Sequence, residues 1–123
     1  MKRHSFKDGE VIFRENDPSD SAYLIMEGQV EIIHERKRDQ NTTVAMLGRG
    51  EYFGEMGVID DKPRSATARA KGETSCMSVS QEEFMDMLLN RPQESIELLK
   101  VLFARLRKAN DRLLLLEKAG NQG

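Results

Sequence analysis

The chain has 123 residues and a formal net charge of -2, and 33% of its residues are charged while 38% are hydrophobic. This length allows one domain with a real core but not two. The balanced charge argues against a nucleic-acid-binding protein, which carries a basic excess. No apolar run approaches the roughly 20 residues that a membrane span needs, and none follows the basic residues 2–4 as a signal peptide would require. A single cysteine, Cys76, excludes an internal disulfide and favours the cytoplasm.

The first part of the chain, residues 6–50, is typical of short strands separated by turns. A dense turn cluster occupies residues 16–20, and the Glu27-Gly28 pair between two apolar runs predicts a tight hairpin. Residues 35–41 form a charged loop in this prediction. The predicted strands are 11–13, 22–26, 30–34 and 42–47. Short, evenly spaced strands with antiparallel connections indicate a barrel or a jelly roll.

After residue 65 the pattern continues as two strands and then changes to helices. Strands are predicted at 66–71 and 74–79, with Cys76 as a small core residue. Ser80 and Glu83 form a capping box, which predicts a helix over residues 81–90. Pro92 then starts a long helix that runs to about residue 118, where Gly120 ends it.

The long helix carries an apolar stripe at heptad spacing. Its members are Leu99, Leu102, Leu106, Ala109, Leu113 and Leu116. Such a stripe favours pairing with a second copy of the chain, that is, a homodimer through this helix. The alternative is that the whole stripe packs on the chain's own strands.

The stretch with the most distinctive chemistry is residues 53–68. Gly54 permits unusual backbone conformations and a close approach to a ligand. A short helical turn from Glu55 presents free backbone N–H groups, which favour an anion. Arg64 can make paired charge-assisted bonds to phosphate oxygens, and Ser65 adds a hydroxyl group and a backbone N–H. Glu55 only accepts hydrogen bonds, so it suits a sugar hydroxyl rather than a phosphate. One phosphate and one hydroxyl on a compact ligand fit a cyclic nucleotide.

Plainer interpretations exist for each of these residues. An arginine after a proline in a polar loop is often a solvated charge, and a Gly-Glu pair often marks a turn. The order of the residues is more specific than either. The stretch resembles the phosphate-binding cassette of cyclic nucleotide-binding domains, with matches at Phe53, Gly54, Glu55, Pro63, Arg64, Ser65, Ala66 and Thr67. We refer to residues 53–67 as the cassette.

The resemblance extends to the N-terminal strands and covers roughly residues 6–118. Residues 10–15, 17–18, 23–25 and 27–30 follow the β-roll of this family of sensors, of the catabolite activator and protein kinase A regulatory type. One departure is Asn16, which stands where the family commonly has glycine. Asparagine tolerates the left-handed conformation better than most residues, so we expect the turn to survive.

The resemblance implies a fold and a set of ligand contacts. The fold is of the α+β class: an antiparallel β-roll, or jelly-roll-like double-stranded β-helix, with a short cassette helix and C-terminal helices of which the last is long. A single domain would span residues 1–123, with the roll at about 6–80 and helices at about 81–90 and 92–118. We expect ligand contacts from Gly54, Glu55, Met56, Arg64, Ser65 and Ala66 in the cassette, and from Arg105 and Asn110 in the last helix.

The last helix bears on which base is bound. By register against the family, Arg105 reaches the glutamate and the ribose, while Ala109 and Asn110 fall where base-contacting hydroxyl residues occur. Ala109 cannot make that bond but Asn110 can, and Ser65 permits either base, so the ligand is cAMP or cGMP. Arg105 could instead be a surface charge that pairs with Asp111 or Glu97.

We therefore expect a non-catalytic, cytoplasmic cyclic nucleotide sensor that signals by moving its C-terminal helix. Only His4 and His34 are available for metal or triad chemistry, which argues against an enzyme and against a metal. The expected partners are the nucleotide, a second copy and an unknown protein, without direct nucleic-acid binding or a membrane span. The alternatives are a nucleotide-free interaction or dimerisation domain, and the sensor half of a larger regulator.

Overall fold

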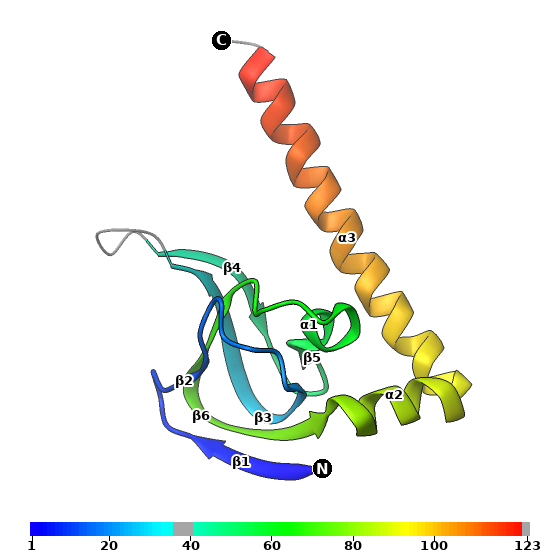
Figure 1. Ribbon diagram of the computed structural model, residues 1–123. Helices are drawn as coiled ribbons and strands as arrows, with labels where there is room; N and C mark the ends of the chain where they lie inside the picture. Colours follow the sequence, from blue (N-terminus) through cyan, green and yellow to red (C-terminus); the bar gives the residue numbers. More distant parts are fainter. Residues whose placement is uncertain (36–40, 122–123) are drawn as a thin grey trace. The chain divides into compact units, whose positions relative to one another are not determined.

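The computed structural model describes residues 1–35 and 41–121, with side chains as far as residue 116 at the C-terminal end. Its elements follow in the order β1 (Lys2–Phe6), β2 (Val11–Phe13), β3 (Ser21–His34), β4 (Thr42–Leu47), β5 (Tyr52–Phe53), α1 (Glu55–Asp60), β6 (Thr67–Ser80), α2 (Gln81–Asn90) and α3 (Pro92–Asn121) (Figure 1). These residues divide into two compact units, one from Met1 to Met85 and one from Asp86 onward.

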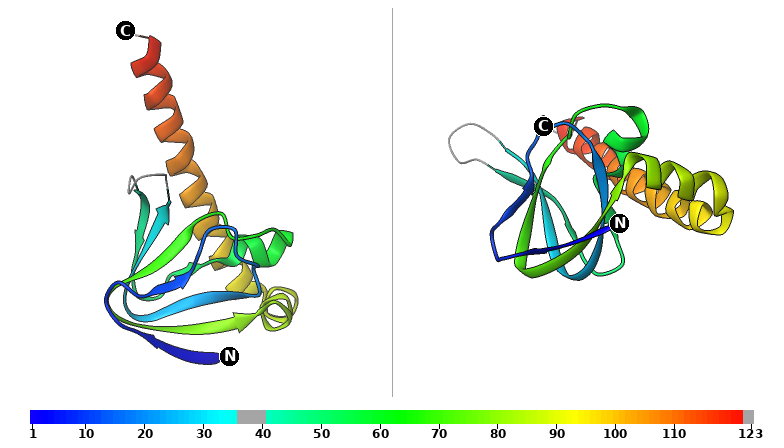
Figure 2. Two further views of the ribbon diagram at one scale, coloured as in Figure 1. Left: turned by 60° about the vertical axis from the view of Figure 1, so that its left-hand side comes forward. Right: turned by 60° about the horizontal axis from the view of Figure 1, so that its bottom comes forward.

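The first unit is an antiparallel roll of six strands. The strands pair in the order β1-β6-β3-β4, with β2 also paired to β6 and β5 to β3. Figure 2 shows the strands wrapping around a common interior rather than forming a flat sheet. The interior holds a cluster of buried side chains: Ile25, Val30, Leu47, Phe53, Ala68 and Cys76. The predicted fold class and the core position of Cys76 are confirmed.

The hairpin predicted at Glu27-Gly28 is wrong, because β3 is one continuous strand through this point. Gly28 has φ +90°, and the pairing of β3 with β6 is irregular on both sides of it, which marks a bulge rather than a turn. A Cβ atom at Gly28 would lie 2.5 Å from the carbonyl oxygen of Glu73 on β6. The glycine is therefore required by the close approach of two strands that both continue past it.

The break predicted at residues 71–73 is wrong for the same reason. β6 is one strand through Gly72, which has φ +75°. The sequence prediction also missed β1 and the two-residue strand β5. The strand predicted at 42–47 matches β4. The predicted charged loop at 35–41 lies largely outside the described residues.

The helices begin where the sequence predicts. Ser80 Oγ accepts from the backbone N–H of Glu83 at 3.1 Å, and Glu83 Oε1 accepts from the N–H of Ser80 at 3.2 Å, so the capping box is confirmed. Pro92 is the first residue of α3. The predicted end near residue 118 is wrong, because the helical backbone continues to Asn121. A glycine inside a helix costs only about 1 kcal/mol, so Gly120 alone does not end it.

Candidate functional site

Gly54 joins the short strand β5 to the cassette helix α1. It is the N-cap of α1 and adopts the left-handed conformation, with φ 75°. A Cβ atom there would lie 2.6 Å from Arg64 Nη1 and 3.0 Å from Cε2 of Phe13. Both the backbone conformation and the crowding thus require glycine. Because Gly54 has no Cβ atom, the start of α1 can lie directly against the side chain of Arg64.

The guanidinium group of Arg64 is buried beneath the cassette, and the residue is only 4% exposed. Nη1 donates to the carbonyl oxygen of Gly54 at 2.8 Å, and Nη2 donates to that of Ser21 at 2.7 Å. Nη2 also lies 3.5 Å from Oδ1 of Asp20. The third nitrogen of the group, Nε, is buried without a hydrogen-bond partner among the described residues. Such a donor is costly to leave unmatched, so it indicates where an acceptor is needed.

An aromatic platform supports this guanidinium. Its central carbon lies 4.1 Å from the centroid of the Phe13 ring, within the range of a cation–π contact. Phe13 packs in turn against Tyr23 and Phe53, with ring centroids 5.9 and 5.8 Å away. Desolvation in this environment lowers the pKa of Arg64, while the electrostatic influence of Tyr23, Asp20, Asp17 and Glu55 opposes that shift. Arginine stays charged within any ordinary pH range, so the site holds a fixed cation.

The backbone around Arg64 is tied to the turn between β2 and β3. The N–H of Asn16 donates to the carbonyl oxygen of Arg64, and the N–H of Arg64 donates to that of Asp17, both at 2.8 Å. Asn16 has φ 77°, so the predicted left-handed conformation at this position is confirmed. Thr67 fixes the far end of the cassette, since its Oγ1 accepts from the N–H of Glu15 at 2.9 Å. The cassette is thus held by a turn that lies far from it in sequence.

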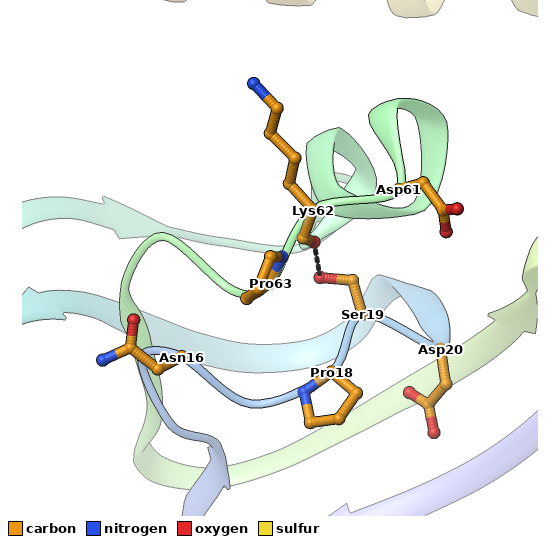
Figure 3. Close-up of a pocket in the computed structure, with 7 residues that line it drawn as sticks. All are labelled: Asn16, Pro18, Ser19, Asp20, Asp61, Lys62 and Pro63. Atoms are coloured by element: carbon orange, nitrogen blue, oxygen red, sulfur yellow. Dashed lines mark hydrogen bonds between the residues drawn. The ribbon is translucent and has the colours of Figure 1, made fainter.

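A second contact holds the loop before Arg64. Ser19 Oγ donates to the carbonyl oxygen of Lys62 at 2.7 Å (Figure 3). Beside this contact is a cavity of about 330 Å³, lined by Asn16, Pro18, Ser19, Asp20, Asp61, Lys62 and Pro63. A second cavity of about 410 Å³ is lined by residues of β1, β3 and β6. Neither lining includes a predicted ligand-binding residue.

The structure brings part of the predicted site together. Gly54, Glu55, Arg64 and Ala66 lie in or beside the buried part of the cassette, and Glu55 is 2% exposed. Ser65 and Met56 have exposed side chains. Arg105, which is half-buried, and the exposed Asn110 belong to α3 in the second unit.

Sequence reasoning missed Phe13, Asp20 and Ser21 as neighbours of Arg64. Phe13 occupies an ordinary strand position, and Ser21 takes part through a backbone carbonyl, so neither leaves a pattern. Asp20 is the one that a signal could have revealed, because it is an acid in the turn cluster immediately before β3.

No group of three or more His, Cys, Asp or Glu side chains within 1–35 and 41–116 is arranged to hold a metal ion. No helix within the described part is both long enough and apolar enough to cross a membrane.

Comparison with known proteins gives a match to the family model described as cyclic nucleotide-binding domain, over residues 3–91. A cAMP-dependent protein kinase regulatory subunit from Dictyostelium discoideum is 36% identical over 100 residues, which is 74% of this chain and 31% of that protein. The chain therefore spans about a third of that relative.

Solved structures agree with the family match. The catabolite activator protein of Thermus thermophilus superposes with a TM-score of 0.84 at 33% identity, covering 94% of this chain and 55% of that one. The EAL enzyme Bd1971 has been solved in a cAMP-bound form, with a TM-score of 0.69 at 31% identity over 95% of this chain and 32% of that one. Its cGMP-bound form gives 0.70 at 30% identity over 98% and 32%. With the family model matched over most of its length, this chain belongs to the cyclic nucleotide-binding domain family.

Proposed function

We propose that this chain is a non-catalytic sensor module that binds cAMP or cGMP and signals by moving its C-terminal helix. The family match and the ligand-bound forms of a similar protein support the ligand class. The observation that carries the proposal is the buried Nε of Arg64, which has no hydrogen-bond partner in the described structure. A cyclic phosphate brings an anionic oxygen that accepts a hydrogen bond from this donor.

The phosphate contact follows from the donors that Arg64 has left. The carbonyl oxygens of Gly54 and Ser21 hold Nη1 and Nη2, which fixes the plane of the guanidinium. In this proposal, Nε and the neighbouring N–H on the same edge donate to two phosphate oxygens, in the fork geometry that arginine uses for phosphates. Ser65 adds its hydroxyl group, and the backbone N–H groups of Ala66 and of Met56 at the start of α1 complete the phosphate contacts.

Glu55 recognises the sugar in this proposal. Its carboxylate lies in the first turn of α1, is 2% exposed and acts on Arg64 electrostatically. The ribose 2′-hydroxyl donates to this carboxylate beside the backbone of Gly54. An acceptor-only group at this point selects a ligand with a hydroxyl and disfavours a second phosphate.

The output is a movement of the helices after β6. α2 ends at Asn90 and α3 starts at Pro92, so Arg91 is the single residue between them. The N–H of Arg91 donates to the carbonyl oxygen of Met87 at 2.9 Å, and Ser95 Oγ donates to that of Leu88 at 2.9 Å. In this proposal the chain bends at Arg91, and these two hydrogen bonds are the ones that must adjust. Nucleotide binding then draws α3 over the base, where Arg105 reaches the ribose and Asn110 the base edge.

The wider setting completes the proposal. The module is one domain over residues 1–123, works in the cytoplasm and dimerises through α3, and the output reaches a further protein. Since the chain spans about a third to a half of the relatives it resembles, the sensor half of a longer regulator is an alternative. A nucleotide-free dimerisation domain is a second alternative, which the long exposed helix favours.

Calorimetric titration of nucleotide-stripped protein with cAMP and with cGMP tests the proposal. We expect one site per chain. Arg64→Ala removes two charge-assisted hydrogen bonds of about 1.5–3 kcal/mol each, so its affinity should fall by about 100-fold or more. Arg49→Ala is the matched control, because Arg49 is an exposed arginine outside the cassette. Circular dichroism establishes that both variants are folded. Unchanged affinity in folded Arg64→Ala, or no heat with either nucleotide, would overturn the proposal.

A further inference from the structure

The guanidinium of Arg64 has two kinds of neighbour, and only one of them uses its hydrogen-bond donors. Nη1 and Nη2 donate to the carbonyl oxygens of Gly54 and Ser21. The central carbon, Cζ, instead lies over the ring of Phe13, 4.1 Å from the ring centroid. An aromatic ring attracts a positive charge through its electron-rich face and takes up no N–H donor in doing so. Nε–H is left unpaired, although it is buried.

The chemical class of the side chain at position 13 is what makes this arrangement possible. A carboxylate, amide or hydroxyl group beside the guanidinium would accept a hydrogen bond from Nε and so occupy it. A leucine or valine would leave Nε unpaired but would not attract the charge. An aromatic ring both attracts the cation and keeps the donor available for a ligand.

The Phe13 ring is itself held from several sides. It packs against Tyr23 and Phe53, with ring centroids 5.9 and 5.8 Å away, and those two rings stack on each other at 5.2 Å. A Cβ atom at Gly54 would lie 3.0 Å from Cε2 of Phe13, so the cassette backbone also lies against this ring. In the sheet, Phe13 pairs with Ala68, next to the end of the cassette. The ring is therefore a fixed surface beneath the guanidinium.

A fixed surface matters here because a competing acceptor lies nearby. Asp20 Oδ1 is 3.5 Å from Arg64 Nη2, and the Asp20 side chain is 85% exposed, so this carboxylate has room to change its rotamer. A guanidinium that shifted toward the carboxylate would pair with it and would offer a phosphate fewer donors and less net charge. Holding Arg64 on the ring before a ligand arrives avoids this loss, which is how preorganisation increases affinity.

We propose that Phe13 is a positioning residue for the nucleotide phosphate. Its ring holds the charged guanidinium of Arg64 in place in the ligand-free protein and keeps Nε–H directed at one of the two exocyclic phosphate oxygens. Phe13 thereby sets the affinity for the phosphate and the discrimination between these two oxygens. This inference rests on the proposed function and deepens it, because it gives a residue outside the cassette a specificity role at the same site.

NMR relaxation of arginine side chains tests the first part of the proposal without any ligand. The order parameter of the Arg64 Nε–H bond measures how firmly the group is held, and the spectrum of Arg64→Lys identifies its signal. We expect about 0.85 in the parent, as for rigid backbone, and less than about 0.6 in Phe13→Leu. Phe13→Tyr keeps a ring and should stay near the parent. An equally rigid Nε–H in folded Phe13→Leu would overturn the proposal.

Titration with phosphorothioate analogues of cAMP and cGMP tests the second part. In each of the two diastereomers, sulfur replaces a different exocyclic oxygen, and sulfur is the weaker hydrogen-bond acceptor. The parent should bind the two diastereomers with dissociation constants about tenfold apart, the effect of weakening one charge-assisted hydrogen bond. Phe13→Leu should bind the unmodified nucleotide about tenfold more weakly and should reduce the ratio to about threefold or less. A ratio in Phe13→Leu equal to that of the parent would contradict the specificity role.

Phe6→Leu is the matched control for the loss of an aromatic ring. Phe6 packs against the same core cluster, whereas the rings near the Arg64 guanidinium are those of Phe13 and Tyr23. This control should lose stability but keep the Nε–H order parameter and the diastereomer ratio of the parent. Equal effects of Phe6→Leu and Phe13→Leu on both quantities would show a general loosening of the core and refute the specific role. Phe13→Met, whose longer side chain fills more of the ring's space, replaces Phe13→Leu if that variant does not fold.

The two measurements also separate this inference from the sensor itself. A parent that binds neither cAMP nor cGMP would refute the sensor, and a mobile Nε–H in Phe13→Leu would still show that the ring holds Arg64. A parent that binds nucleotide, together with a Phe13→Leu variant that matches it in order parameter and ratio, would leave the sensor standing and refute the role of Phe13.

Discussion

Replacing Gly57 by alanine sets helix propensity against packing in the cassette. Gly57 lies inside α1, and a Gly→Ala change inside a helix is ordinarily stabilising by about 1 kcal/mol. Here the added Cβ would meet Ser19 Oγ, and it would lie 2.6 Å from both the Lys62 carbonyl oxygen and Ser19 Cβ. The Lys62 oxygen is a backbone atom and Ser19 Cβ is bonded to the backbone, so these two atoms move only if the cassette loop or the turn before β3 moves with them.

The free-energy cost of overpacking is larger than the gain in helix propensity. Overpacking costs about 1–3 kcal/mol, and displacement of Ser19 or Lys62 also weakens their 2.7 Å hydrogen bond, worth about 1 kcal/mol. The net expectation for Gly57→Ala is a loss of about 1–3 kcal/mol of unfolding free energy. In a unit of this size, 1 kcal/mol corresponds to roughly 4–8 °C in melting temperature.

Urea denaturation followed by circular dichroism measures this loss. Gly48→Ala is the control, because a Cβ atom at Gly48 meets nothing within 4 Å; its effect should stay within about 0.5 kcal/mol. Adding Ser19→Gly to Gly57→Ala removes two of the contacts. The unfolding free energy of the double variant should therefore exceed, by about 0.5 kcal/mol or more, the value expected if the effects of the two single substitutions simply added. A Gly57→Ala protein that is more stable than its parent would refute this account of the cassette.

Three other expectations follow from contacts in the roll. Phe13→Leu removes the ring beneath Arg64 and should lower the unfolding free energy by about 1–2 kcal/mol. Phe13→Tyr keeps a ring at this position, so its unfolding free energy should stay close to that of the parent; urea denaturation compares the two variants. The hydrogen bonds from Arg69 and then Thr43, at 2.6 and 2.8 Å, lower the pKa of Glu31. Because its pKa is lowered in the folded state, Glu31 stabilises the fold at any pH above the ordinary glutamate pKa. This stabilisation is lost as the pH falls through the pKa that Glu31 has in the folded protein. Glu31→Gln should therefore flatten the decline in unfolding free energy below about pH 5. An identical acid profile for parent and variant would contradict this. Burial raises the pKa of Cys76 to about 11, so a thiol reagent should modify the native chain slowly and the urea-unfolded chain rapidly; rapid modification of the native chain would show that the core opens.

The parts of the fold that sequence predicts are those fixed by local chemistry. The capping box at Ser80, the start of α3 at Pro92 and the left-handed Asn16 each depend on a few neighbouring residues. The hairpin at Gly28 failed because a glycine with positive φ serves a turn or a bulge equally well. Which one forms depends on whether a partner strand continues alongside, and here Gln29 lies opposite Lys71 of β6. That partner is distant in sequence and leaves no local trace.

The candidate site divides in the same way. Arg64 and Glu55 are found from sequence because their order within the cassette is specific. The residues that hold Arg64 in place cannot be found from sequence, because Phe13 acts through ring packing and Ser21 through a backbone oxygen. Likewise, the burial of Leu98 on α3 could not be predicted, because heptad spacing alone does not show which side of a helix is covered.

The pairing of the first strand with the last has a consequence for biosynthesis. Lys2 lies opposite Ser78, and β2 also pairs with β6. Strands β3 and β4 can pair with each other as soon as residue 47 has been synthesised. Strands β1 and β2 have no strand to pair with until β6, residues 67–80, has been synthesised. Contacts this far apart in sequence make folding slow, and unpaired strands are prone to aggregation in the interval. A nascent chain that stalls within the cassette should therefore need a chaperone, whereas one that has passed Ser80 can close its sheet unaided.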